Sequence, residues 1–145
     1  SINSRISATK SPAFVSSPLI FLISSLSSTA FVVKTHGKAG LGDVKLPKST
    51  DSFSSKNAVE LIYEKALELN GELEIVAVGP LTNIAIALLL HPELKKLVKH
   101  LWIMGGAVYG GNVTPTAEFN IWCDPEAARM VLTSPSPAFP CVASA

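Results

Sequence analysis

Two kinds of hydrophobic pattern alternate along the second half of this 145-residue chain, and this alternation restricts its fold more than any other feature. Residues 74–78 and 100–104 are short apolar runs, typical of buried strands. Apolar residues recur at helical spacing in residues 56–70. Residues 83–90 are expected to form an apolar helix, and residues 124–132 a helix that starts at a capping residue. The order strand, helix, strand, loop, helix favours right-handed crossovers. We therefore expect an α/β fold with an open, mostly parallel sheet and helices on both faces, incomplete at both ends.

Local signals mark where these helices begin and end. Asn70 is followed by glycine, a combination that commonly stops a helix. Pro92 can open a second, more polar helix through Val98, because proline is favoured in the first turn. Asp124 followed by Pro125 has the cap and first-turn residue expected at a helix start.

Composition excludes several classes of protein. The net charge is +1 and the basic residues are scattered, so we expect no nucleic-acid partner. The two cysteines, Cys123 and Cys141, form no CxxC pair and have no nearby histidine, which argues against a zinc site or a disulfide framework. A small neutral or polar ligand fits this composition better than a macromolecule.

The first 33 residues differ from the rest, because they are rich in serine and contain no acidic side chain. Residues 18–33 are apolar but shorter than the roughly 20 residues that a membrane-spanning helix needs. They weakly resemble a signal peptide, although no cleavage site directly follows. We favour a buried strand, near residues 30–33, or non-native sequence, and expect a cytoplasmic protein that does not bind a membrane.

The last residues also depart from the alternating pattern. Residues 133–145 contain three prolines where another strand would be expected, and proline is rare in central strands. We therefore divide the chain into a serine-rich apolar segment at 1–33, a partial α/β domain at 34–132 and a proline-rich tail at 133–145.

Polar residues gather after the second predicted strand. Ligand sites in open α/β sheets lie at the carboxyl ends of strands, where both residues 79–83 and the pair Gly105 and Gly106 are expected. The loop that follows carries Asn112, Glu118 and Asn120 between apolar neighbours. Each could be an ordinary exposed or turn residue. Together they offer the mixture of donors and acceptors that suits the vicinal hydroxyls of a sugar.

Other candidate motifs are weaker. The glycines of residues 105–111 match neither a dinucleotide-binding nor a Walker pattern. His36 is either a catalytic base or a turn residue, and no partner for it is evident. We expect His91 and His100 to be surface or capping residues. Cys123 has no evident activating base.

Several spaced motifs occur in the order found in one enzyme family. These are GPLTNIA at 79–85, MGG at 104–106, GNVTP at 111–115, AEFN at 117–120 and DPEAA at 124–128. They resemble the inosine-uridine preferring nucleoside hydrolases, and Thr35-His36-Gly37 is similar to an earlier loop of that family. The resemblance spans about residues 34–132.

This resemblance implies hydrolysis of the N-glycosidic bond of ribonucleosides with one bound calcium ion, and possible homo-oligomers. By position, the backbone carbonyl of Thr82 would be a calcium ligand. Asn112, Glu118 and Asn120 would bind the ribose, and Met104 would pack beside it.

The chain departs from the family in its acidic residues. The family opens with an aspartate cluster that supplies most calcium ligands and the general base, yet this chain has no carboxylate side chain before Asp43. A later aspartate and a neighbouring histidine are also missing, so no catalytic residue is assigned. We expect the chain to be either the central portion of a nucleoside hydrolase, deficient in catalysis alone, or a non-catalytic remnant or sugar-binding module.

Overall fold

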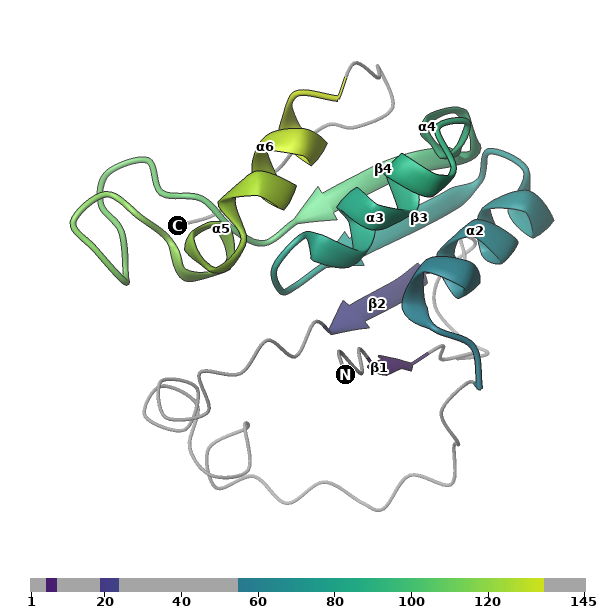
Figure 1. Cartoon of the computed structure of the whole chain (residues 1–145), viewed down its shortest axis with the longest axis horizontal. Coiled ribbons are helices and arrows are strands. Elements are labelled where there is room, and N and C mark those ends of the chain that lie inside the picture. The colour runs from purple at the N-terminus through teal and green to yellow at the C-terminus, as the bar shows by residue number, and fades with distance from the viewer. Residues whose placement is uncertain (1–4, 8–18, 24–54, 135–145) are drawn as a thin grey trace.

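The described strands form one open sheet in the computed structural model, which describes residues 5–7, 19–23 and 55–134. The strand order is β1 (Arg5–Ser7), β2 (Leu19–Ile23), β3 (Leu73–Ala77) and β4 (Val98–Ile103) (Figure 1). β1 pairs antiparallel with β2, whereas β2, β3 and β4 run parallel. The predicted open, mostly parallel α/β sheet is therefore confirmed.

Five helices accompany the sheet in the described part of the chain: α2 (Ala58–Leu69), α3 (Thr82–Leu90), α4 (Leu94–Leu97), α5 (Phe119–Cys123) and α6 (Pro125–Leu132). The predicted helices at 56–70, 83–90 and 124–132 are confirmed within two residues. The helix expected from Pro92 to Val98 is shorter, because Val98 already begins β4. α5 lies in a segment that we expected to be loop.

The N-terminal third is described only in its two short strands. β2 lies within the apolar residues 18–33, for which a strand was one of the expectations. The strand expected near residues 30–33 and the loop that contains His36 lie outside the described residues. So does nearly all of the tail at 133–145.

Local sequence signals explain the ends of α2. The side chain of Asn57 caps the helix by accepting the N–H of Glu60 at 2.9 Å. At the other end, Asn70 adopts a left-handed conformation with φ of 42°, and its N–H donates to the carbonyl of Ala66 at 3.0 Å. Asparagine and glycine tolerate positive φ better than other residues. The expected stop at Asn70 and Gly71 is thus confirmed.

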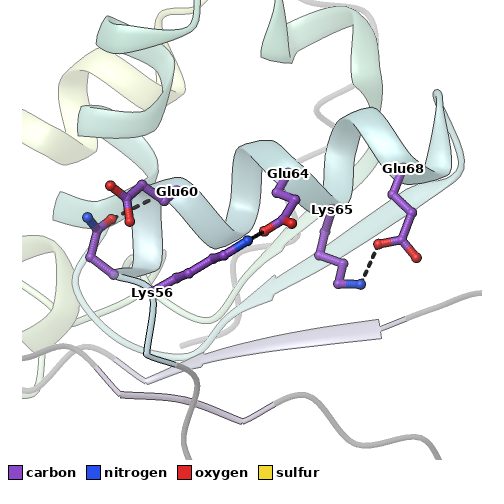
Figure 2. A network of polar contacts seen from close by, with 6 residues as sticks. Lys56, Glu60, Glu64, Lys65 and Glu68 are labelled. Carbon is purple, nitrogen blue, oxygen red and sulfur yellow. Dashed lines mark hydrogen bonds and ion pairs between the residues drawn. The ribbon is translucent and has the colours of Figure 1, made fainter.

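The solvent-facing side of α2 carries ion pairs. Lys56 pairs with Glu64, and Lys65 pairs with Glu68 one turn along the helix (Figure 2). The ammonium group of Lys56 lowers the pKa of Glu64. Because these side chains are largely exposed, such pairs add little stability and mainly keep this face polar.

The core lies between the sheet and the helices on one of its faces. Alternate residues of β3, namely Leu73, Ile75 and Ala77, are buried, as are Leu101 and Ile103 of β4. These side chains pack with α2, α3, α4 and α6 in one hydrophobic cluster. Strand side chains alternate between faces, so the burial of every second residue indicates that residues 55–134 cover one face of β3 and β4.

The opposite face of β3 and β4 is more accessible. Trp102 is 36% exposed there, and its indole N–H donates to Glu74 at 3.2 Å. Consecutive parallel strands joined by right-handed crossovers place their connecting helices on the same side. For this reason α2 and α3 share a face (Figure 1). A second layer of helices is not seen among the residues that the structure describes.

The apolar helix α3 is too short to cross a bilayer. Within residues 55–134, no helix combines the length and hydropathy of a membrane span.

Candidate functional site

The carboxyl ends of β3 and β4 meet at one edge of the sheet. The N–H of Met104 donates to the carbonyl of Ala77 at 2.9 Å, so the two strands end side by side. Asn120, which is only 6% exposed, lies against both ends. Its carboxamide donates to the carbonyl of Met104 at 2.9 Å and reaches that of Val78 at 3.5 Å. The two loops expected at a common crevice are therefore connected by one buried side chain.

Glu118 is a buried carboxylate held by backbone N–H groups. It is 7% exposed, and its Oε2 accepts from Gly106 at 3.1 Å, Asn120 at 3.0 Å and Ile121 at 3.2 Å. Two of these donors belong to the first turn of α5, so Glu118 is the N-cap of that helix. The alternative of a solvated carboxylate on an exposed loop is wrong.

The glycine pair after β4 makes room for this carboxylate. A Cβ at Gly105 would lie 3.2 Å from Glu118 Oε2 and 3.3 Å from Ile121 Cδ1. Gly106 has φ of 89°, a conformation that side chains disfavour, and it is the residue that donates to Glu118. The turn therefore brings the end of β4 close to the start of α5.

Asn112 closes the loop that precedes α5. Its Oδ1 accepts the N–H of Phe119 at 2.8 Å, while its own N–H donates to the carbonyl of Ala117 at 3.1 Å. A Cβ at Gly111 would lie 2.3 Å from backbone atoms of Thr114 and Ala117, so only glycine fits there. Asn112 is exposed, unlike Glu118 and Asn120, and so forms the solvent-facing side of the cluster.

Met104 and Thr82 complete the predicted set. Met104 is 42% exposed, and its sulfur lies 3.5 Å from the carboxamide nitrogen of Asn120. Thr82 begins α3 directly after the β3 turn, and its hydroxyl donates to Asp124. Asn120 thus contacts both Met104 and Glu118: its side chain lies against Met104, and its backbone N–H donates to Glu118. Thr82 is attached to the segment that carries Glu118 and Asn120 by its hydrogen bond to Asp124, which directly follows α5.

Comparison with known proteins identifies the family. A sequence model of the inosine-uridine preferring nucleoside hydrolases matches residues 15–144. The chain belongs to this family. The matched range is wider than the residues 34–132 that carry the motifs described above.

Curated members of the nucleoside hydrolase family are similar over the middle of the chain. Uridine nucleosidase 1 of Arabidopsis thaliana is 50% identical over 100 residues, which cover 68% of this chain and 30% of that protein. The pyrimidine-specific ribonucleoside hydrolase RihB of Escherichia coli O139:H28 is 42% identical over 102 residues, covering 70% and 33%. The chain therefore spans about a third of the length of these relatives.

Solved structures of nucleoside hydrolases share the fold. A plant nucleoside hydrolase, PpNRh1, superposes with a TM-score of 0.67 at 39% identity, covering 74% of this chain and 34% of that one. The purine-preferring ribonucleoside hydrolase of Gardnerella vaginalis gives 0.69 at 32% identity, covering 88% and 41%.

Three other residues considered in the sequence analysis, His91, His100 and Cys123, lie outside this cluster of hydrogen bonds. His91 is the C-cap of α3 and stacks on Tyr63 with ring centroids 3.5 Å apart. His100 lies on the exposed face of β4, near Trp102. Burial raises the pKa of the Cys123 thiol, and the carboxylates of Glu118 and Asp124 raise it further. A raised pKa opposes thiolate formation, which agrees with a cysteine that lacks an activating base.

Two features of this cluster were not predicted from the sequence. One is α5, whose five residues are too few to show helical periodicity. The other is the contact between Thr82 and Asp124, which are 42 residues apart. The helix start at Asp124 was predicted from its cap, but no local pattern signals its second partner.

Proposed function

We propose that this chain is the central portion of a nucleoside hydrolase, an enzyme that cleaves the N-glycosidic bond of ribonucleosides to give ribose and free base. The observation that supports this most directly is the buried pair Glu118 and Asn120, fixed at the ends of two parallel strands. Buried polar side chains are costly unless paired, and here one side of each is paired with backbone. The other side of each remains to meet a ligand.

The proposed ribose contacts use the side-chain atoms of Glu118 and Asn112 that do not take part in the hydrogen bonds described above. The hydrogen bonds that Glu118 accepts within the described residues all end on Oε2, which leaves Oε1 able to accept. Asn112 uses Oδ1 for Phe119, which leaves its Nδ2 able to donate. A sugar hydroxyl both donates and accepts, so one acceptor and one donor on the same loop are suited to it. We assign Met104, with its half-exposed thioether, to the apolar side of the ribose.

Uridine is the first substrate to test. The relatives at 50% and 42% identity are named for uridine and pyrimidine nucleosides. A solved structure at 32% identity is of a purine-preferring enzyme. We therefore propose a pyrimidine ribonucleoside, with inosine as the comparison substrate.

Calcium is proposed for the complete site only. The ion takes six to eight oxygen ligands, roughly. Within residues 55–134 no group of three or more His, Cys, Asp or Glu side chains could hold a metal. The backbone carbonyl of Thr82 would supply one ligand, and the described residues do not fit the ion by themselves. We therefore propose that this chain alone is deficient in catalysis.

Two measurements test the proposal. In the first, uridine is titrated into the ¹⁵N-labelled chain, and we expect shift changes at the amides of Gly106, Asn112 and Asn120. Unchanged spectra at millimolar uridine would overturn the proposed ribose site. In the second, ribose release from uridine and inosine is assayed with and without calcium. We expect none above the buffer rate, and clear turnover would refute the proposed deficiency.

A non-catalytic sugar-binding module is the alternative. It also predicts uridine binding without turnover, so the flanking reading frame is the discriminating observation. An upstream aspartate cluster would support the hydrolase.

A further inference from the structure

Asp124 stands where two helices meet, and its carboxylate makes two different contacts. It directly follows α5 and directly precedes α6. Oδ1 accepts the N–H of Ala127 at 3.0 Å and so caps α6. Oδ2 accepts the hydroxyl proton of Thr82. A helix cap needs only one acceptor, so the contact with Thr82 goes beyond capping.

Thr82 connects this corner to the other half of the site. It is the first residue of α3, which begins after the turn that follows β3. α3 packs on α6, and small buried residues, Ala85 on α3 with Ala127 and Ala128 on α6, belong to their shared core. Small side chains let helices approach closely, so the short side chains of Thr82 and Asp124 can form a hydrogen bond. The hydrogen bond therefore links the turn after β3 to the segment after β4.

The short helix α5 depends on such links at both ends. Five residues are too few for a helix to be stable by itself. Glu118 attaches the N-terminal end of α5 to Gly106 after β4. Asp124 attaches the C-terminal end to Thr82 on α3. Asn120 lies between these two attachments, with its side chain against both strand ends.

We propose that Asp124 is a positioning residue of the sugar site. Through Thr82 it holds α5 in place, and with it Asn120 and the capping carboxylate of Glu118. This inference rests on the proposed function for the identity of the ligand. The structural part of the proposal is that the hydrogen bond between Thr82 and Asp124 keeps α5 in place. This part does not depend on the proposed function.

Thr82→Val is the discriminating variant. Valine has nearly the same shape, lacks the hydroxyl and keeps the backbone carbonyl. Thr82→Ser restores the hydroxyl. Val131→Ala is the matched control, because Val131 is buried in α6 and its truncation weakens the core without touching the hydrogen bond. Asp124→Ser keeps a capping oxygen for α6 but is too short to retain both contacts.

Amide hydrogen exchange tests whether the hydrogen bond between Thr82 and Asp124 keeps α5 in place. In Thr82→Val we expect the amides of Asn120 and Ile121 to exchange about tenfold faster than in Val131→Ala, since a factor of ten corresponds to about 1.4 kcal/mol. Thr82→Ser should restore the slow rate. Asp124→Ser combined with Thr82→Val should add little to Asp124→Ser alone, as expected when two residues share one interaction. Equal exchange in Thr82→Val and Val131→Ala would overturn the proposal.

Uridine affinity tests the link to the site. We expect Thr82→Val to weaken uridine binding about tenfold relative to Val131→Ala, the factor that corresponds to about 1.4 kcal/mol. Faster exchange at α5 with unchanged uridine affinity would refute the positioning role while leaving the proposed function intact. Absence of uridine binding in the unsubstituted chain would overturn both the proposed function and the sugar site. The exchange result would then establish only how α5 is attached.

Discussion

Replacing Glu118 by alanine removes the common acceptor of three backbone N–H groups. Two of them, at Asn120 and Ile121, lie in the first turn of α5, and the third, at Gly106, lies in the turn after β4. Glu118→Ala therefore removes both a helix cap and the link between that helix and the sheet. We expect this substitution to lower the free energy of unfolding more than most single changes at polar residues.

The magnitude can be worked from these contacts. Loss of an N-cap costs about 1 kcal/mol. The link to Gly106 is a hydrogen bond to a charged acceptor, and such bonds are worth about 1.5–3 kcal/mol. Removing a buried carboxylate also removes its desolvation cost, which offsets part of the loss. A net loss of about 2 kcal/mol follows, equivalent to a fall in Tm of about 4–8 °C for a chain of this size.

Urea unfolding followed by circular dichroism measures this difference. Glu118→Gln keeps one oxygen acceptor but loses the charge and replaces the second oxygen by an amide donor, so we expect about half the destabilisation. Glu126→Ala is the matched control, because Glu126 is an exposed acid in the first turn of α6 and its loss costs less than about 1 kcal/mol. If Glu118→Ala is no more destabilising than Glu126→Ala, Glu118 does not hold α5 to the sheet.

Three further predictions follow from single contacts. Gly111→Ala should destabilise the chain by at least about 2 kcal/mol in thermal unfolding, because its Cβ would lie 2.3 Å from backbone atoms. Gly110→Ala, with its nearest atom at 3.9 Å, should change little, and equal effects would contradict the loop geometry. The Cys123 thiol should react with a disulfide reagent more slowly than free cysteine at neutral pH, because burial raises its pKa; peptide mass spectrometry measures this, and faster reaction would count against burial. Tyr63→Phe should raise the pKa of Glu93, since the Tyr63 hydroxyl donates to that carboxylate at 2.6 Å and lowers its pKa. Because the folded pKa is the lower one, this contact stabilises the chain above the ordinary pKa of a glutamate and is lost as the pH falls; an unchanged NMR titration in the variant would show that the bond is absent.

The sequence determined the order and kind of the main elements. Apolar periodicity placed α2 within two residues, because helix burial repeats every few residues along the chain. An apolar run placed α3 and a capping residue placed α6 with similar accuracy. The caps at Asn70 and Asp124 were equally readable, because each depends on the conformation and side chain of one or two residues. Spaced motifs were also sufficient to indicate the family, as the match over residues 15–144 confirms.

The roles of individual site residues were less accessible. Glu118 could be an exposed acid or a ligand from its local sequence, and the structure adds a third role as the cap of α5. Glutamate is not a preferred N-cap, so the usual capping signal was absent. Asn112, expected to bind a sugar, also closes its own loop through Phe119. The assignment of both to the ribose stays a prediction.

What only the tertiary structure decided are the contacts between distant segments. Asn120 reaches the carbonyl of Val78 and Asp124 reaches the hydroxyl of Thr82, each across 42 residues of chain. The side of the sheet that is covered is likewise set by the strand order. Local patterns record which residues form a helix or strand, because burial and capping act over a few residues. Local patterns do not indicate which strand end lies beside which helix, because that depends on how the helices and strands pack together in the folded chain.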